Sequence, residues 1–273
     1  MLTKLRISLA LVTVLSVAGS IVPVSAAGLL VNPSIAITDT VTVQPILVSD
    51  TNGANPADFF GSAGQQVSIE GFIDTIWAQA GIDVNFLAPN TWDNTFANWG
   101  VGGPPDNSGN TRPGSDLNTV VSDGAAAGVI NADPNVINMY FVNIPAGFAL
   151  LGDNSAAGIG RVGGNGIMQY VGTNLLGFGE GQEVVASVVA HEIGHNLGLD
   201  HIVENENLMQ GAGSSNSGDR LNGAQVAIAL ASNLSVTAPV APVPVPPALV
   251  LMLSGLVGLF GIFGKRRQAK LSL

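Results

Sequence analysis

Residues 191–201 read His-Glu-Ile-Gly-His-Asn-Leu-Gly-Leu-Asp-His, and this stretch holds every histidine of the 273-residue chain. Residues four apart lie on one face of a helix, so His191 and His195 can offer ring nitrogens to the same metal ion. Gly198 can adopt the left-handed conformation that ends a helix, and the resulting turn brings His201 back toward them. Three neutral imidazoles around an open fourth position are the ligand set of a catalytic zinc site.

Glu192 adds a carboxylate beside this predicted metal site. It directly follows His191, so its side chain leaves the helix on a different side, where it can accept a proton from the attacking water instead of binding the metal. A bare H-E-x-x-H also occurs by chance on helix surfaces. The longer pattern, with its glycine and third histidine, arises by chance far less often. The sequence therefore predicts a hydrolytic zinc site with Glu192 as general base and acid.

The pattern resembles the signature of the metzincin metallopeptidases, H-E-x-x-H-x-x-G-x-x-H. The resemblance implies a zinc endopeptidase with one catalytic Zn2+ and a protein or peptide as substrate. It also implies a methionine turn below the metal, for which Met209 is the candidate; a methionine filling an ordinary core gap is the alternative. Gly211 stands where astacins and serralysins have a tyrosine, and no nonapeptide repeats follow, so the nearer likeness is to the reprolysin-like branch.

The order of predicted elements favours one α/β (α+β) domain over residues 28–237. It agrees with what the resemblance implies: a metzincin-like domain with a twisted mixed sheet, an antiparallel edge strand, a zinc helix, a methionine turn and a C-terminal helix. The right-handed crossover rule makes the first two strands parallel neighbours. Strands are expected at 40–48, 82–87 and 136–144, and helices at 64–80, 116–127, 181–197 and 221–231, the last capped by Ser217 or Asp219.

Hydrophobic periodicity predicts which sides of two helices are buried. The zinc helix is expected to bury four valines, and the first helix is expected to bury Val67 with its aromatic and aliphatic neighbours. The four residues of the zinc helix are Val184, Val185, Val188 and Val189.

Residues 166–171 are predicted to form the edge strand of the sheet. In metzincins, an edge strand just before the zinc helix binds an extended peptide by adding it to the sheet. An ordinary edge strand without a ligand is the alternative. The resemblance thus assigns substrate binding to Gly166, Ile167, Met168, Gln169, Tyr170 and Val171.

Charge is distributed very unevenly along the chain. Between residues 28 and 237 there are three basic and 19 acidic residues, a net charge of −16. Such a surface argues against nucleic acid or an anionic membrane surface as a partner, because both need clustered lysine and arginine. The chain has no cysteine, so disulfides are excluded.

A glycine- and proline-rich stretch between residues 89 and 128 contains a candidate calcium loop. Asp106, Ser108 and Asn110 alternate oxygen-bearing side chains, as loops that hold Ca2+ do. No glutamate closes this loop, and a solvated turn is the alternative reading.

Residues 1–27 have the features of a secretory signal peptide. Lys4 and Arg6 form a basic start, residues 7–22 are apolar, and small residues follow for cleavage. An uncleaved anchor is the alternative, although the apolar run is short for a membrane span. We expect an exported protein whose mature chain begins near Gly28.

The other end of the chain carries a second targeting pattern. Residues 238–247 form a spacer rich in proline and valine, residues 248–264 are almost wholly apolar, and three cationic residues follow. This end resembles the PEP-CTERM sorting tails of Gram-negative bacteria, in a variant with Val-Pro-x-Pro at its head. The resemblance implies that residues 248–273 contact the membrane until an exosortase-like enzyme removes them and the protein reaches the cell surface, outer envelope or matrix. A permanent anchor is the alternative.

The predicted fold and tail also fit a protein that is not an enzyme. A surface or matrix binding protein on a metzincin fold, with little or no peptidase activity, would also carry such a tail. Glu192 argues against it, because a scaffold that only binds metal needs no proton acceptor beside its ligands.

Overall fold

The computed structural model describes residues 29–99, 113–143, 157–170, 181–211 and 218–238. The chain divides into two units, residues 1–236 and 237–273, and the second lies almost wholly outside the described ranges. The predicted signal, the calcium-like loop and residues 239–273 of the tail also lie outside them. Within the described ranges, no helix is both long and apolar enough to span a membrane.

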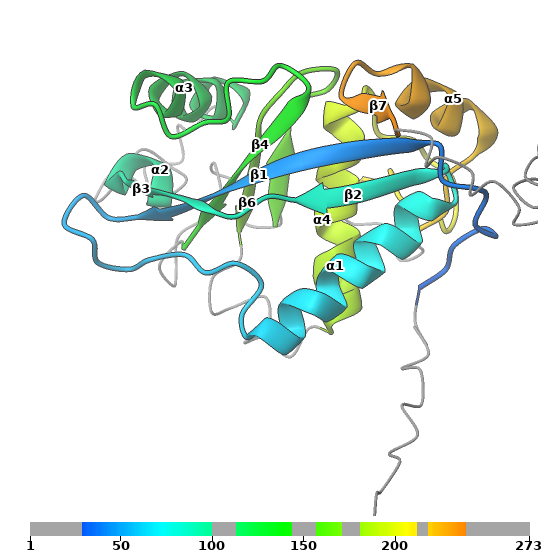
Figure 1. The fold of residues 1–273 in the computed structure, drawn as a ribbon, viewed down its shortest axis with the longest axis horizontal. Helices are drawn as coiled ribbons and strands as arrows, with labels where there is room; N and C mark the ends of the chain where they lie inside the picture. Colours follow the sequence, from blue (N-terminus) through cyan, green and yellow to red (C-terminus); the bar gives the residue numbers. More distant parts are fainter. Residues whose placement is uncertain (1–28, 100–112, 144–156, 171–180, 212–217, 239–273) are drawn as a thin grey trace, which may run out of the picture. The chain divides into compact units, whose positions relative to one another are not determined.

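The first unit is built around a twisted mixed sheet flanked by helices (Figure 1). The strands follow the order β2-β1-β4-β6-β5, with β3 also pairing β1. All these pairs are parallel except β5 with β6. In chain order the elements are β1 (Asp39–Ser49), α1 (Ala63–Ala78), β2 (Ile82–Phe86), β3 (Asn90–Asp93), α2 (Thr95–Trp99), α3 (Pro113–Ala126), β4 (Val136–Val142), β5 (Gly158–Gly160), β6 (Ile167–Tyr170), α4 (Gln182–Asn196), α5 (Gly223–Ala231) and β7 (Ser235–Thr237).

β1 changes its partner half-way along its length. Val43 is its last residue paired with β2, and Ile46 is its first paired with β3. Pro45 lies in the interval between these partners, where its missing N–H leaves no ladder bond unmade. The Gln44 side chain spans the same interval and donates to the Ala88 carbonyl at 2.8 Å. The proline is therefore compatible with a central strand.

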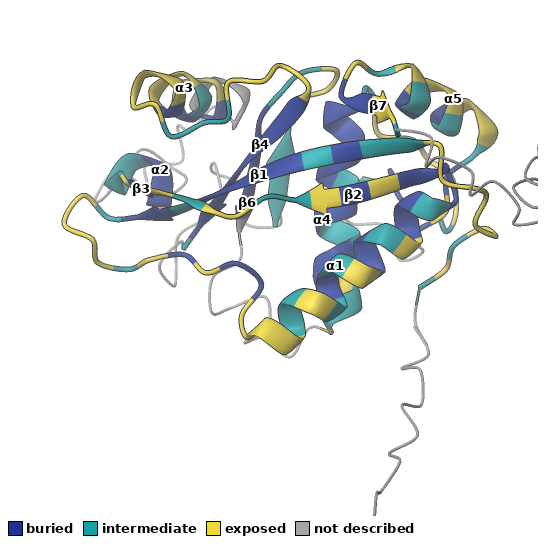
Figure 2. Cartoon of the chain, in the orientation of Figure 1, coloured by how far each residue is buried: buried dark blue, intermediate teal, exposed yellow. Residues whose placement is uncertain are grey.

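The two faces of the sheet pack against different helices. On β4, Met139 and Phe141 face a core shared with α1 and α4, whereas Tyr140 and Val142 face a second core shared with α3. The alternation follows from the two-residue period of a strand. Figure 2 shows β4, much of β1 and the inner sides of α1 and α4 buried, whereas β2 and β3 are partly exposed. The helix that carries the histidines is thus fixed against the sheet along one side.

Most predicted elements are confirmed, with ends that differ by a few residues. The mixed sheet, the parallel pair β1 and β2, and helix α4 all lie where the sequence placed them, and the sheet has an antiparallel edge strand, although at other residues than predicted. The cap of α5 differs: Asn222 accepts the N–H groups of Ala224 and Gln225, so neither Ser217 nor Asp219 is the cap. The short elements β3, α2 and β5 were not predicted.

The position of the edge strand corrects the prediction for residues 166–171. β6 pairs with β4 on one side and β5 on the other, so its backbone is already hydrogen-bonded along both edges. The side chains of Ile167, Met168 and Gln169 are fully buried. Among the described residues the strand at this edge is β5, and Val171 lies outside them.

Two burial predictions are also wrong. Val67 on α1 is 72% exposed, and Val184 on α4 is 42% exposed. Val188 is only partly buried, because this side of α4 lines a cleft instead of the core. Val185 and Val189 are fully buried, as predicted.

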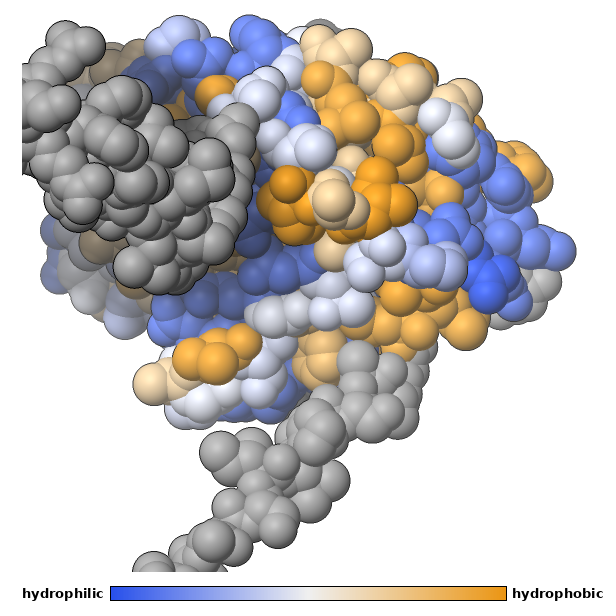
Figure 3. All heavy atoms as spheres, turned by 45° about the vertical axis from the view of Figure 1, so that its right-hand side comes forward, coloured by the Kyte–Doolittle hydropathy of each residue, from blue (hydrophilic) through white to orange (hydrophobic). Residues whose placement is uncertain are grey.

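Apolar side chains also reach the surface elsewhere. Figure 3 shows them in patches between hydrophilic areas on the face that it turns forward. Exposed apolar residues of this kind are common on folded domains and carry no function by themselves. The larger ones away from the cleft include Ile35, Ile37, Ile228 and Val236.

Candidate metal centre and cleft

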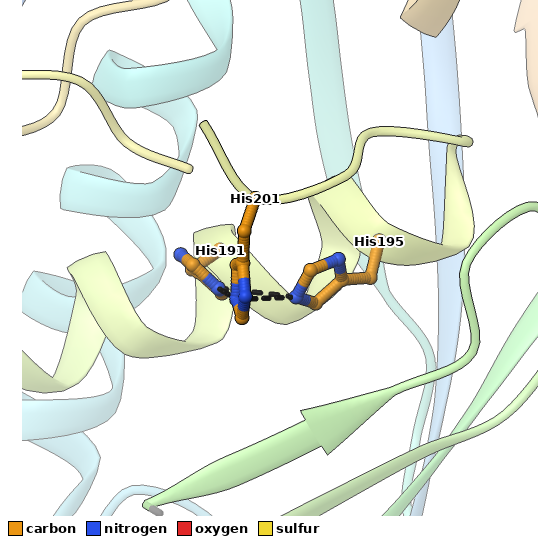
Figure 4. Close-up of side chains that lie close together, drawn as sticks. All are labelled: His191, His195 and His201. Carbon is orange, nitrogen blue, oxygen red and sulfur yellow. Dashed lines mark hydrogen bonds between the residues drawn. The ribbon is translucent and has the colours of Figure 1, made fainter. Parts of the chain in front are cut away.

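The three histidines meet at one point (Figure 4). His191 and His195 project from α4, and His201 comes from the loop that follows it. The Nε2 atom of His191 lies 3.1 Å from that of His195 and 3.1 Å from that of His201, and the third separation is 3.2 Å. The structure thus brings together all three residues predicted as metal ligands.

The chain returns to this point through a turn at Gly198. This glycine has a φ of +99°, a conformation that residues with a Cβ rarely adopt. Its N–H donates to the His195 carbonyl at 2.9 Å, and the Leu199 N–H donates to the Gly194 carbonyl at 2.9 Å. These bonds close the last turn of α4 and lead the chain toward His201.

Backbone carbonyls fix the orientation of two of the rings. His191 Nδ1 lies 2.6 Å from the Leu208 carbonyl oxygen, and His195 Nδ1 lies 2.8 Å from that of Leu199. A carbonyl oxygen only accepts, so each Nδ1 carries the hydrogen and each Nε2 keeps a lone pair. Burial lowers the pKa of His191 to about 4 and also lowers the pKa of His195, so both rings are neutral at neutral pH.

The geometry of these nitrogens fits a zinc ion. Tetrahedral zinc with Zn–N bonds of about 2.0–2.1 Å holds its ligand nitrogens about 3.3–3.4 Å apart. The observed separations of 3.1, 3.1 and 3.2 Å are close to this value. Lone pairs on neutral imidazoles turned toward one point are also the donor set that zinc prefers. We therefore assign one zinc ion to His191, His195 and His201.

Glu192 lies beside this group and is buried, with 6% of its surface exposed. Its carboxylate accepts the Gly160 backbone N–H, while Oε2 has no hydrogen-bond partner among the residues that the structure describes. Burial raises the pKa of Glu192 to about 8, and the bond from Gly160 acts in the opposite direction. A cation bound by the neighbouring histidines would lower this pKa again, because it favours the ionised form, and the carboxylate could then accept a proton at its free oxygen.

Two glycines of β5 allow the strand to lie directly against Glu192. A Cβ at Gly158 would lie 2.6 Å from Glu192 Cγ, and a Cβ at Gly160 would lie 2.7 Å from the Glu192 carbonyl oxygen. Any side chain at either position would push β5 away from α4. No role was predicted for these two residues, although their Gly-x-Gly spacing before the zinc helix was a signal that could have indicated one.

Met209, the candidate for the methionine turn, packs against the helix that carries two of the ligands. It is fully buried, and a Cβ on Gly194 would lie only 2.6 Å from its sulfur, so it packs against α4 between the two helical histidines. Its N–H donates to Asn207 Oδ1 at 2.8 Å. The preceding residue, Leu208, supplies the carbonyl that orients His191. The turn therefore supports the site from below and fixes one ligand.

A buried amide pair holds this turn against α5. Asn207 Nδ2 donates to Gln225 Oε1 at 2.9 Å, and Gln225 Nε2 donates to Asn207 Oδ1 at 3.0 Å. Gln225 Oε1 also accepts the Asn222 N–H at the start of α5. The C-terminal helix thus contributes to the position of Met209, although it lies outside the histidine motif.

A cleft of about 660 Å³ opens around the site. The three histidines and Glu192 line it, with β5 along one wall and α4 along the other. Of the residues predicted to bind substrate, Gly166, Ile167, Met168 and Gln169 do not line it. The strand that does line it is β5, together with Ala157 and Val162.

The position of Asp219 in the cleft was also not predicted from the sequence. Its carboxylate accepts the Ser187 hydroxyl of α4 and, at 3.1 Å, the Leu30 N–H. Burial raises the pKa of Asp219, and these bonds lower it in part. Asp219 therefore ties the N-terminal segment and the loop before α5 to the wall of the cleft.

Residues 110–202 match the family model described as metallo-peptidase family M12B, reprolysin-like. This segment contains His191, Glu192, His195 and His201. The match and the three-histidine group support a zinc-dependent peptidase. A protein or peptide is its substrate, as the peptidase family implies.

Solved structures give a weaker likeness. Archaemetzincin from Methanopyrus kandleri is 14% identical, with a TM-score of 0.42, and the match covers 71% of this chain and 96% of that one. Archaemetzincin from Archaeoglobus fulgidus is 16% identical, with a TM-score of 0.38 and coverage of 69% and 99%. Metalloproteinase-II from Bacteroides fragilis is 14% identical, with a TM-score of 0.43 and coverage of 74% and 56%. No curated protein matches the peptidase significantly.

Proposed function

We propose that the peptidase is an endopeptidase that hydrolyses internal bonds of a peptide bound along β5 in the cleft. The observation that carries this proposal is the convergence of three Nε2 atoms beside a buried glutamate with one free oxygen. Bound zinc would supply a Lewis acid that polarises the peptide carbonyl and stabilises the negative charge that develops on it.

Glu192 moves the proton in this reaction. Its carboxylate accepts a proton from the water whose oxygen joins the carbonyl carbon, and it returns that proton to the nitrogen of the leaving amine. The Gly160 N–H fixes one side of the carboxylate, so the unpartnered Oε2 is the atom we assign to proton transfer. The oxygen of the water thus becomes part of the new carboxyl group, and one of its protons becomes part of the new amine.

β5 is the strand to which we assign peptide binding, in place of residues 166–171. Its pairing with β6 occupies one edge, and its residues line the cleft. An extended peptide can add to such an edge through main-chain hydrogen bonds. Strand addition binds the middle of an extended peptide and needs neither of its ends. It therefore favours cleavage of internal bonds.

We further propose that the protein is exported and then sorted to the cell surface or envelope. The support is the sequence of residues 1–27 and of the tail from residue 238. Mass analysis of the protein recovered from its native cells tests this: a chain that begins near residue 28 and lacks the apolar tail supports processing, and intact ends contradict it.

Proteolysis of an unfolded generic protein tests the peptidase assignment. The zinc-loaded full chain should produce internal fragments, and removal of the metal by a chelator should abolish them. Glu192→Ala should retain one zinc but lose about 10²–10⁴-fold in rate, because it removes the proton acceptor. Glu70→Ala, which makes the same change on α1, is the matched control and should retain activity.

Three results would contradict the proposal in different ways. Turnover retained in Glu192→Ala would remove Glu192 from the mechanism. Release of terminal residues alone would replace the endopeptidase with an exopeptidase. Bound zinc without cleavage of any protein would favour a binding protein built on the same fold.

A further inference from the structure

The cleft continues beyond the zinc ligands along α4, toward the N-terminal end of the helix. At about 1.5 Å of rise per residue, Ser187 lies about 6 Å and Glu183 about 12 Å from His191 along the helix axis. Two valines, Val188 and Val184, also line the cleft on this stretch. From the zinc site outward, this side of α4 presents His191, Val188, Ser187, Val184 and Glu183.

Apolar and acidic groups from outside α4 line the same part of the cleft. They are Leu29, Leu208 and Asp219. The hydrogen bond from the Ser187 hydroxyl fixes the Asp219 carboxylate at the level of Ser187 on α4. A side chain that enters beside the zinc ligands therefore passes Val188 before it reaches Asp219 at the level of Ser187. Glu183 lies about two turns of rise, about 12 Å, from His191 along the helix axis.

No lysine or arginine lines this cleft in the part of the chain that the structure describes. The single salt bridge in the same part joins Arg220 to Glu206. Arg161 donates instead to Asn118 and to the Asn165 carbonyl. Carboxylates in a partly enclosed site without a cationic partner are costly to desolvate, and a cation from the substrate would offset that cost.

We propose that this half of the cleft takes a lysine or arginine side chain of the substrate, next to the bond that is cut. This inference rests on the proposed peptidase function and names its preferred substrate. The stem of such a side chain, about 6 Å long when extended, would lie along the apolar lining. Its cationic head would then reach Asp219, with Glu183 beyond it.

Other side chains match the lining less well. A glutamate would place a third negative charge beside Asp219 and Glu183, which is unfavourable in a site of low dielectric. A leucine would fill the apolar part but leave both carboxylates without a cation. The negative charge of residues 28–237 also favours the approach of cationic peptides over anionic ones.

A series of peptides that differ at one position tests the inference with the zinc-loaded full chain. Lysine is compared with norleucine, arginine with citrulline, and both with leucine and glutamate. We expect kcat/KM to be about tenfold or more higher for each cation than for its uncharged counterpart, because the charge pair is partly desolvated. Glutamate should be the poorest residue, and the preference for cations should weaken as salt is added.

Charge-removing variants identify the carboxylates responsible. Asp219→Asn should bring the lysine-to-norleucine ratio close to one while the norleucine peptide is still cut. Glu183→Gln should lower the ratio by a smaller factor; because Glu183 is more exposed, this variant keeps the test available if Asp219→Asn does not fold. Asp83→Asn removes an exposed charge on β2 and is the matched control, for which the ratio should not change.

Each outcome separates this inference from the proposed function. Equal rates for lysine and norleucine would overturn the inference and leave the peptidase intact. A preference for lysine that survives in both Asp219→Asn and Glu183→Gln would overturn the role of these carboxylates. No cleavage of any peptide or protein by the wild type would overturn the proposed function and this inference together.

Discussion

The two walls of the cleft differ in what they present to the site: side chains on α4 and glycine backbone on β5. On the α4 wall the site is made of side chains, and two of the three ligand rings are fixed by carbonyls of Leu208 and Leu199. On the β5 wall, Gly158 and Gly160 have no side chains, so the backbone itself lies against Glu192. The position of Glu192 therefore depends on both walls, although only the α4 wall carries the histidine motif.

Gly160→Ala tests the β5 wall and should have the largest effect among the variants that keep the ligands and Glu192. The new Cβ would lie 2.7 Å from the Glu192 carbonyl oxygen and 3.1 Å from His195 Cβ, so β5 must move away from α4. Because Glu192 then loses its N–H partner and its position, we expect kcat/KM to fall about 100-fold. Peptide hydrolysis and zinc content, measured on the same sample, would show the loss of rate with zinc retained.

Gly164→Ala is the matched control for this change. It lies in the turn after β5, and its Cβ would come no closer than 3.4 Å to the Arg161 side chain. Its activity should stay near that of the wild type. If Gly160→Ala were equally active, the close approach of β5 would have no part in placing Glu192.

Asn207→Ala tests the support of the α4 wall and should mainly affect stability. The change removes the acceptor for the Met209 N–H and leaves the buried Gln225 amide without its partner. The free energy of unfolding should fall by about 1–3 kcal/mol. Thermal unfolding should show a Tm lower by about 2–4 °C for each kcal/mol.

Asn135→Ala provides the comparison for that measurement. Asn135 is exposed before β4, and the hydrogen bond it makes, to Asp133, comes from its backbone N–H. The substitution should leave the Tm almost unchanged. An equal loss in both variants would mean that the Asn207–Gln225 pair contributes nothing specific to the turn.

The contrast between the walls also explains what the sequence could predict. The α4 wall was predictable because ligand spacing on a helix and the turn at Gly198 are local properties of the chain. The β5 wall was not, because a three-residue strand with two glycines has little strand propensity and its function depends on a contact with Glu192, 32 or more residues away.

Two further errors have the same origin. Residues 167–170 have the pattern of a strand, but their pairing on both sides is set by β4 and β5, which the local sequence does not reveal. Val184 and Val188 follow the apolar period of a buried helix face, yet they line the cleft. An apolar residue at helical spacing therefore predicts contact with apolar surface, whether in the core or in a substrate cleft.

Met209→Leu should have the smallest effect and sharpens the comparison within the α4 wall. Leucine has nearly the volume of methionine, so packing against Gly194 should be retained at a cost below about 1.5 kcal/mol. If Met209 acts only as a floor, zinc content and kcat/KM should stay near the wild-type values while the Tm falls slightly. A large loss of zinc or activity without a matching loss of stability would mean that the thioether sulfur itself acts on the site, and the α4 wall would then extend to the turn beneath it.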